Sequence, residues 1–203
     1  MRQRVSMKSI EVLDLIQIGS TGRNSGKTTL AKKLIAENYQ RFSIYGLKII
    51  TISGRRGQCQ RGEVGCGICT SIEEGYELIE ETNRIGTKDT MQLLKAGCKK
   101  VYLLKVFHDH LLEGFLTFLQ VVPRDTVIVC ESNSLREVVK PGIFVMMANQ
   151  KSIKKTAANV IQYADLILNT PELPETIRLI KDQEGVHFSK NSVEDRREKV
   201  WVH

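Results

Sequence analysis

The sequence predicts an α/β protein in which helices cover both faces of a mainly parallel sheet of about six or seven strands. Short runs rich in Ile, Leu and Val recur along the chain, and stretches with the apolar spacing of helices separate them. One run, residues 126–130, is apolar between its ends, which is typical of a strand buried on both faces. Parallel sheets of this kind bind their ligands at the carboxyl ends of the strands.

Each element has a local signal in the sequence. The expected strands cover residues 9–18, 47–52, 101–106, 126–130, 143–147 and 165–168. Helices are expected from a glycine-rich loop to residue 39 and over residues 71–83, 87–96, 109–123, 152–163 and 174–182. A capping-box pattern of Ser71 and Glu74 predicts the start of the second helix. Gly97 ends the third helix and Pro123 the fourth.

The length and composition indicate a single soluble domain. The chain has 203 residues, of which 41% are apolar and 26% are charged. We expect residues 1–184 to form one domain that contains an insert loop rich in Cys, Arg and Gly at residues 54–70. Residues 185–203 are expected to form a charged tail. No apolar run approaches the ~20 residues of a membrane span, so a cytoplasmic location is expected.

Charge and cysteine content narrow the possible partners. The net charge of +7 is modest and no recognition motif accompanies it, which argues against nucleic-acid binding. Disulfides are not expected for the five cysteines of a cytoplasmic-type chain. Cys98 and Cys130 are expected to be small buried residues.

Residues 18–30, Ile-Gly-Ser-Thr-Gly-Arg-Asn-Ser-Gly-Lys-Thr-Thr-Leu, have the pattern of a phosphate-binding loop, or P-loop, between a strand and a helix. Backbone N–H groups of such a turn and the positive end of the helix dipole bind phosphate oxygens. We expect Lys27 to bind the β- and γ-phosphates and the Thr28 hydroxyl to bind Mg²⁺. The usual pattern has glycine where this chain has Thr21. The nucleotide-binding residues expected in the loop are Gly22, Arg23, Asn24, Ser25, Gly26, Lys27, Thr28 and Thr29.

Two acidic residues are candidates for Mg²⁺ binding or catalysis beside the loop. Glu131 ends the apolar strand, where a P-loop protein needs an acid to hold Mg²⁺ through water or to orient a nucleophile. The alternative is a solvated carboxylate at a strand end. Asp89 opens a helix and suits an N-cap as well as a Mg²⁺ site. We therefore expect Lys27, Glu131 and Asp89 to be catalytic, and Thr28, Glu131 and Asp89 to bind Mg²⁺.

The insert loop contains the pattern C-x₆-C-x₂-C, formed by Cys59, Cys66 and Cys69. A Cys-x-x-Cys pair lets two thiolates reach one ion, so Zn²⁺ or Fe binding is one interpretation. A flexible loop with reduced thiols is the other. His108 and His110 follow a strand and are further candidate ligands, although a histidine near a helix start is usually a surface residue.

The identity of the nucleotide base stays open between guanine and adenine. A guanine-binding Asn-Lys-x-Asp motif would follow the fifth strand, and the chain has Asn149-Gln150-Lys151-Ser152 there. Asn149 is the candidate base-binding residue, but the lysine and aspartate of the motif are missing. GTP and ATP therefore both remain candidates.

The sequence resembles the P-loop family of molybdopterin-guanine dinucleotide biosynthesis protein B. The resemblance depends on residues 24–30 of the loop and on Gly-Thr-Lys-Asp-Thr at 86–90, which is followed by Leu-Lys-Ala-Gly at 94–97. An apolar strand that ends in an acid, 127–131, and the later Ala-Asp-Leu-Ile-Leu at 164–168 complete it. Two features depart from the family pattern: Glu131 is followed by Ser-Asn-Ser rather than Glu-Gly, and the cysteine loop is additional.

This resemblance implies a GTP-binding, weakly hydrolysing accessory protein. Such a protein is expected to be a homodimer that assists a partner enzyme in attaching a nucleotide to the molybdenum cofactor. The resemblance assigns nucleotide and Mg²⁺ binding to Lys27, Thr28, Asp89 and Glu131. The departures suggest a sister branch with a different cargo, such as a related step in cofactor or metal-centre maturation.

Two other functions remain as alternatives. A small-molecule P-loop kinase would use a mobile lid with arginines, for which Arg55, Arg56 and Arg61 are candidates. A metal carrier or sensor would use the cysteine loop. The sequence favours the slow nucleoside triphosphatase over both.

Overall fold

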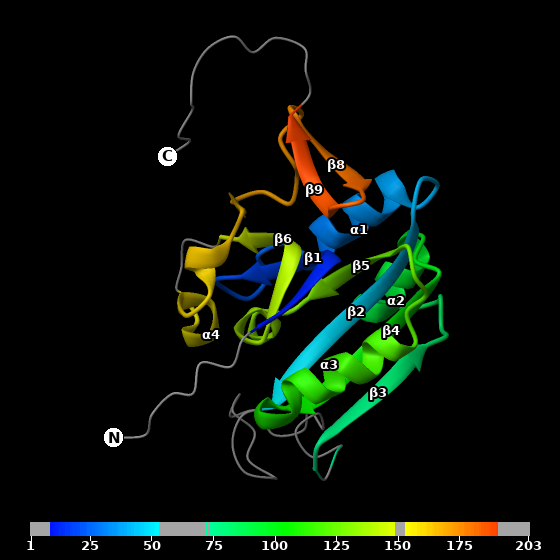
Figure 1. Ribbon diagram of the computed structural model, residues 1–203, viewed down its shortest axis with the longest axis vertical. Helices are drawn as coiled ribbons and strands as arrows, with labels where there is room; N and C mark the ends of the chain where they lie inside the picture. Colours follow the sequence, from blue (N-terminus) through cyan, green and yellow to red (C-terminus); the bar gives the residue numbers. More distant parts are fainter. Residues whose placement is uncertain (1–8, 53–71, 73, 149–152, 191–203) are drawn as a thin grey trace.

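A computed structural model describes residues 9–52, 72, 74–148 and 153–190. Its centre is a seven-stranded sheet with the strand order β3-β4-β2-β5-β1-β6-β7 (Figure 1). The strands are β1 (Ile10–Ser20), β2 (Ser43–Ile52), β3 (Tyr76–Glu81), β4 (Lys100–Phe107), β5 (Thr126–Glu131), β6 (Val139–Met147) and β7 (Leu166–Leu168). The edge strand β3 runs antiparallel to β4, and the other pairs in this sheet are parallel. An α/β fold with a mainly parallel sheet is therefore confirmed.

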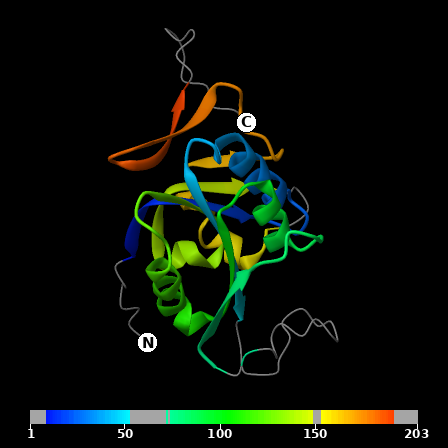
Figure 2. The same ribbon diagram turned by 90° about the vertical axis from the view of Figure 1, so that its right-hand side faces the viewer.

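Helices flank the sheet on both faces. The helices are α1 (Lys27–Asn38), α2 (Asp89–Ala96), α3 (Leu111–Gln120) and α4 (Lys155–Ala158), with 3₁₀ turns at His108–His110, Ser134–Glu137 and Ile161–Tyr163. Leu34 of α1 and Leu93 of α2 pack in one core cluster, whereas Phe115 and Phe118 of α3 pack in a second cluster on the opposite face. Figure 2 shows α3 on one side of the sheet and α1 with α2 on the other. In the described residues, no helix has the length and apolar character needed to cross a lipid bilayer.

The central strands of the sheet bring Glu131 and the glycine-rich loop to the same edge. Strand β5 is buried along its whole length and lies between β1 and β2. In the strand register, Glu131 is level with Ile18 of β1 and with Lys48 of β2. Because these strands are parallel, their carboxyl ends and the loop after β1 lie at the same edge.

The helix expected over residues 71–83 is wrong, because residues 76–81 form the strand β3. Tertiary pairing with β4 decides the conformation here. The carboxylates of Glu77 and Glu80 lie 3.0 Å from the ammonium groups of Lys105 and Lys100 across the strand pair. Ser71, the expected cap, lies outside the described residues.

The helix expected over residues 174–182 is also wrong. Residues 177–182 form strand β8 (Ile177–Asp182), which pairs with β9 (Gly185–Lys190) in an antiparallel hairpin. Leu179 and Val186 of this hairpin are buried in the same cluster as α1 and α2. The expected domain end at residue 184 therefore cuts a packed hairpin, and the first six residues of the expected tail are a strand.

Two other elements differ in extent. The helix expected over residues 152–163 is shorter: among the described residues 153–163, Lys155–Ala158 is α-helical and a 3₁₀ turn follows it. The side chain of Ile153, just before this helix, is 60% exposed. The segment expected as a helix over 109–123 begins with a 3₁₀ turn, and the α-helix that follows buries Phe118 and leaves Leu116 exposed.

Candidate functional site

The glycine-rich loop after β1 is anchored to β6 through Thr21. The Thr21 N–H donates to the Met147 carbonyl at 3.0 Å, and the Thr21 carbonyl accepts from the Lys154 N–H at 2.9 Å. The residue is 3% exposed, so its side chain fills space at the end of the sheet. The threonine at the position of the usual glycine is therefore a buried residue that is hydrogen-bonded to the end of β6.

Gly26 turns the chain from the loop into α1. Its φ of +89° lies in the left-handed region, which glycine adopts without steric strain. The Gly26 carbonyl accepts from the Leu30 N–H at 2.9 Å, which starts the helical ladder. The first N–H groups of an α-helix have no partner within the helix, and the first turn of α1 contains no acidic residue. The start of α1 is therefore suited to an anion.

The Lys27 side chain lies across the loop. Its Nζ donates to Ser20 Oγ at 2.7 Å, and Ser20 Oγ donates to the Gly22 carbonyl at 2.9 Å. Burial, followed by the nearby charge of Lys48, lowers the pKa of Lys27 from 10.5 to about 8. A cavity of about 760 Å³ opens beside it, lined by Arg23, Asn24, Ser25, Gly26, Lys27, Thr28, Thr29, Lys48, Asp89, Lys154 and Thr156.

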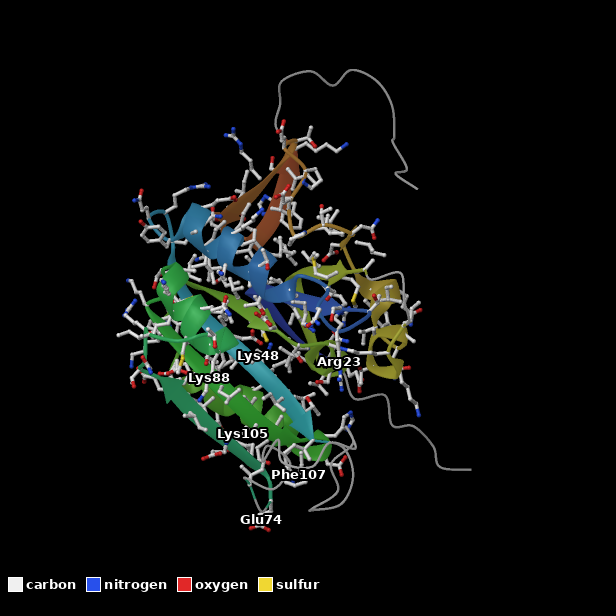
Figure 3. All side chains as sticks on the ribbon, turned by 180° about the vertical axis from the view of Figure 1, so that it is seen from behind. Arg23, Lys48, Glu74, Lys88, Lys105 and Phe107 are labelled. Atoms are coloured by element: carbon white, nitrogen blue, oxygen red, sulfur yellow. The ribbon has the colours of Figure 1, made fainter. Side chains whose placement is uncertain are left out.

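Lys48, which the sequence analysis did not identify, forms ion pairs with both Asp89 and Glu131. Lys48 Nζ lies 2.6 Å from Asp89 Oδ2 and 2.6 Å from Glu131 Oε2. Thr28 Oγ1 donates to the same Glu131 oxygen at 3.2 Å. Figure 3 shows Lys48 on the long strand β2. The signal in the sequence is a single charged residue in the otherwise uncharged run 47–52.

The charges in this cluster stabilise one another. Burial acts to lower the pKa of Lys48, but Glu131 and Asp89 act more strongly together, so that the pKa is raised. Burial acts to raise the pKa of the Asp89 carboxyl, but the hydrogen bond and charge of Lys48 lower it overall. Lys48 and Asp89 are therefore both ionised near neutral pH.

The oxygen atoms in this cluster fit Mg²⁺. Glu131 Oε1 is buried and has no hydrogen-bond partner within the described structure. Mg²⁺ is usually bound through one or two carboxylates together with substrate phosphates and water. Thr28, Asp89 and Glu131 supply such oxygens. Across the described ranges, no group of three or more His, Cys, Asp and Glu residues forms a metal cluster.

A polar recess adjoins the loop cavity. It measures about 450 Å³, and Thr51, Ser132 and Ser134 are among the hydroxyl residues that line it. Ser134 Oγ lies 2.5 Å from Thr51 Oγ1 and 3.3 Å from Ser132 Oγ. Lys27 and Lys48 line both spaces. The Ser-Asn-Ser sequence after Glu131 therefore forms part of the wall beside the loop.

Several expected site residues lie outside the described residues. These are Cys59, Cys66 and Cys69 of the proposed Zn²⁺ or Fe site, Arg55, Arg56 and Arg61 of the kinase hypothesis, and Asn149 of the base site. Cys98 and Cys130 are buried, as predicted. Burial raises the pKa of the Cys98 thiol to about 12 and that of Cys130 well above its ordinary value. Both thiols are therefore protonated and unreactive at neutral pH.

The two candidate histidines contact carboxylates. His108 Nε2 lies 3.0 Å from Glu137 Oε2, and His110 Nδ1 lies 2.9 Å from Glu113 Oε2. Both histidines are exposed and lie in the 3₁₀ turn before α3. His108 also lines the polar recess.

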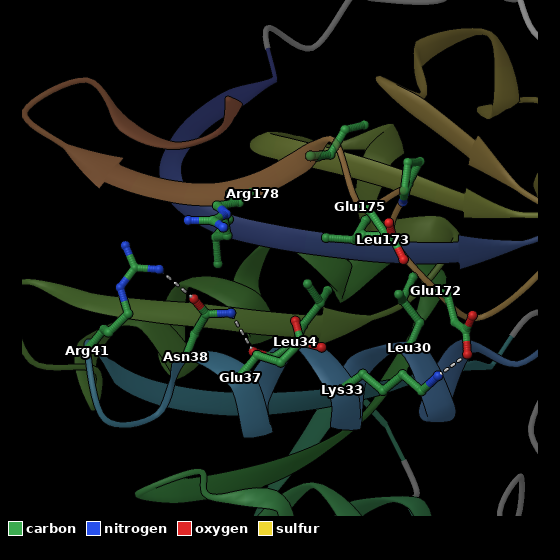
Figure 4. A pocket seen from close by; sticks show the side chains of 13 residues that line it. Leu30, Lys33, Leu34, Glu37, Asn38, Arg41, Glu172, Leu173, Glu175 and Arg178 are labelled. Carbon is green, nitrogen blue, oxygen red and sulfur yellow. Dashed lines mark hydrogen bonds and ion pairs between the residues drawn. The ribbon is translucent and has the colours of Figure 1, made fainter. Parts of the chain in front are cut away.

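A separate cavity of about 560 Å³ lies between α1 and β8 (Figure 4). Lys33 and Glu172 form an ion pair at one end, and Arg41 donates to Asn38 at the other. It shares no lining residue with the loop cavity. The predicted nucleotide site is therefore the space beside Lys27.

Comparisons with known protein families, with characterised proteins and with solved structures found no match.

Proposed function

We propose that this chain is a P-loop protein that binds a nucleoside triphosphate with Mg²⁺ and hydrolyses it slowly. The observation that carries the proposal is the meeting of four residues, predicted separately from the sequence, around two adjoining spaces. Lys27 and Asp89 line both spaces, Thr28 lines the loop cavity and Glu131 lines the recess. Lys27 and Thr28 begin α1, Asp89 begins α2, and Glu131 ends β5. Thr28 contacts Glu131 directly, and Lys48 joins Glu131 to Asp89.

Each residue has a task that follows from its position. The first turn of α1 donates backbone N–H groups to phosphate oxygens, and the Lys27 ammonium adds positive charge beside them. Thr28, Asp89 and Glu131 hold Mg²⁺, which neutralises charge on the phosphates when it is bound. Glu131 is buried, so the low surrounding dielectric strengthens its interactions. By its resemblance to the molybdopterin-guanine dinucleotide family, we propose an accessory role, as a homodimer, in cofactor or metal-centre maturation.

Nucleotide binding is tested by equilibrium dialysis with GTP and with ATP in the presence of Mg²⁺. Lys27→Ala is expected to weaken binding at least tenfold, which is about 1.4 kcal/mol. Lys33→Ala is the matched control, because Lys33 lies on the same helix but pairs with the exposed Glu172. Equal affinity of wild type and Lys27→Ala for both nucleotides would exclude the proposed site. Phosphate release is then measured to detect slow turnover.

The polar recess favours a small-molecule kinase as a second candidate function. A kinase needs space for an acceptor next to the γ-phosphate, and the recess shares Lys27 and Lys48 with the loop cavity. A screen of metabolites with labelled ATP tests this function. Transfer of label to an acceptor supports a kinase, whereas release of label only as inorganic phosphate supports the hydrolase.

A further inference from the structure

The Lys48 ammonium contacts the same carboxylates that are proposed to hold Mg²⁺. Its Nζ is 2.6 Å from one oxygen of Asp89 and 2.6 Å from one oxygen of Glu131. The Glu131 side chain is 0% exposed and that of Lys48 is 19% exposed. The pair is therefore largely shielded from water, where ionic contacts are stronger than at a surface.

The carboxylates of the cluster have at least as many ammonium groups around them, because Lys154 also lines the loop cavity and the recess. The two carboxylates of Asp89 and Glu131 face two ammonium groups, those of Lys48 and Lys27. Lys48 contacts one oxygen of each carboxylate, so a divalent cation that enters alone finds oxygens such as Glu131 Oε1 but lies close to two ammonium groups unless Lys48 moves away. Like charges at such distances repel, so a cation is disfavoured while Lys48 has no other anion to bind.

A nucleoside triphosphate supplies that anion. Lys48 lines the loop cavity as well as the polar recess, so its ammonium borders the space in which phosphates would lie. When phosphate is present, Lys48 can exchange its carboxylate contacts for phosphate oxygens. The carboxylates then become available to Mg²⁺.

We propose that Lys48 is a charge lock that keeps divalent cations out of the site until a nucleoside triphosphate binds. This inference rests on the proposed function and concerns the regulation of the same site. Its consequence is thermodynamic coupling: nucleotide and cation each increase the affinity for the other, beyond their direct attraction. In this proposal Lys48 excludes the cation from the empty site and contacts phosphate in the occupied one.

A purely structural ion pair would behave differently. Removal of one partner from a buried pair destabilises the fold, because the other charge is left uncompensated. That effect alone would not change the affinity of the folded chain for a cation. The test must therefore measure cation binding by the nucleotide-free chain, separately from stability and from hydrolysis.

The probe is Mn²⁺, whose free concentration is measured by electron paramagnetic resonance in the absence of nucleotide. Lys48→Met is expected to bind Mn²⁺ at least tenfold more tightly than the wild-type chain, because both carboxylates lose their cation. Lys48→Arg keeps the charge and is expected to keep the weak wild-type affinity. Lys105→Met is the matched control, because Lys105 lies on the neighbouring strand β4 and forms a 3.0 Å pair with Glu77 of β3, away from the cluster.

A thermal melt covers the case in which Lys48→Met folds poorly. A cation that binds only the folded state raises its melting temperature. Mn²⁺ is therefore expected to raise the melting temperature of Lys48→Met by more than that of wild type. The same is expected of Lys48→Gln, which also removes the charge but keeps a polar side chain. Equal Mn²⁺ affinities and equal melting shifts for wild type and both variants would overturn the charge lock. Failure of wild type to bind any triphosphate with Mg²⁺ would instead overturn the proposed function.

Discussion

The side chain of Asn133 holds both backbone polar groups of Ser20. The Ser20 N–H donates to Asn133 Oδ1 at 2.7 Å, and Asn133 Nδ2 donates to the Ser20 carbonyl at 2.9 Å. Gln17 Nε2 adds a third bond to the Ser132 carbonyl at 2.7 Å. These bonds join the end of β1, where the glycine-rich loop begins, to the segment that follows Glu131. The loop and the acid are thereby fixed relative to each other.

Asn133→Ala is expected to lower the free energy of unfolding by about 1–3 kcal/mol, because it leaves buried backbone groups of Ser20 without partners. Nucleotide affinity is expected to fall as well, since the start of the loop loses its support. Urea denaturation and calorimetric titration measure the two effects. Asn159→Ala, at an exposed position, is the control. Unchanged nucleotide affinity in a destabilised Asn133→Ala chain would show that the loop does not depend on this contact.

Gly19 lies close to the same asparagine. A Cβ at Gly19 would lie 2.9 Å from Asn133 Oδ1 and 3.1 Å from Met146 Cε, so Gly19→Ala must displace Asn133 or its neighbours. We expect the double variant Gly19→Ala/Asn133→Ala to be less destabilised than the sum of the single variants. A coupling of about 0.5–3 kcal/mol is typical of residues in direct contact. Strict additivity in urea denaturation would contradict the predicted clash.

Gly26→Ala is expected to impair both stability and nucleotide binding. A non-glycine residue in the left-handed region costs about 1–3 kcal/mol, and the added Cβ would lie 3.0 Å from Pro171 Cβ. Gly75→Ala is the matched control, because Gly75 has a φ of +62° but open space where its Cβ would lie. Both variants are expected to lose stability, whereas only Gly26→Ala is expected to lose nucleotide affinity. Equal nucleotide affinities in dialysis would show that the turn at Gly26 is not needed for the site.

The parallel part of the fold could be predicted because its signals are local. Gly97 ends α2 with a positive φ, and the run 126–130 is apolar because β5 is covered on both faces. The two strands taken for helices, β3 and β8, depend on partners elsewhere in the chain. The residues of β3 pair with β4, and β8 pairs with β9 across a short turn that ends at Gly185. Single-sequence spacing does not show such partners.

The candidate site could also be predicted only where its signals are local in the sequence. The positions of Lys27 and Thr28 follow from the loop pattern, and the rule that ligands bind at carboxyl ends of strands pointed to Glu131. Lys48 could not be assigned in this way, because its role depends on register: it lies level with Glu131 on the adjacent strand. Asn133 was visible only as a departure from a family pattern. Its contact with Ser20 depends on strand order, which places β5 beside β1.

The lowered pKa of Lys27 predicts that nucleotide affinity falls as the pH rises above about 8. Below that pH the ammonium is charged and attracts phosphate; above it, nucleotide binding requires the uptake of a proton, because bound phosphate raises the pKa of Lys27 again. Calorimetric titrations at pH 8 in buffers of different ionisation enthalpy measure this uptake. Lys27→Arg is the control, since a guanidinium does not titrate in this range. Equal proton uptake by wild type and Lys27→Arg would contradict the prediction.

The same pKa predicts an opposite pH dependence for stability. In the unfolded chain Lys27 has its ordinary pKa of 10.5, whereas in the folded chain the value is about 8. Between these two values the unfolded state binds more protons at this residue, so its contribution to the free energy of unfolding increases with pH. The free energy of unfolding of wild type and of Lys27→Met is measured by urea denaturation from pH 7.5 to 10. The difference between the two is expected to shift in favour of wild type as the pH rises, over the range in which nucleotide affinity falls. A difference that stays constant over this range would show that Lys27 is not desolvated in the folded chain.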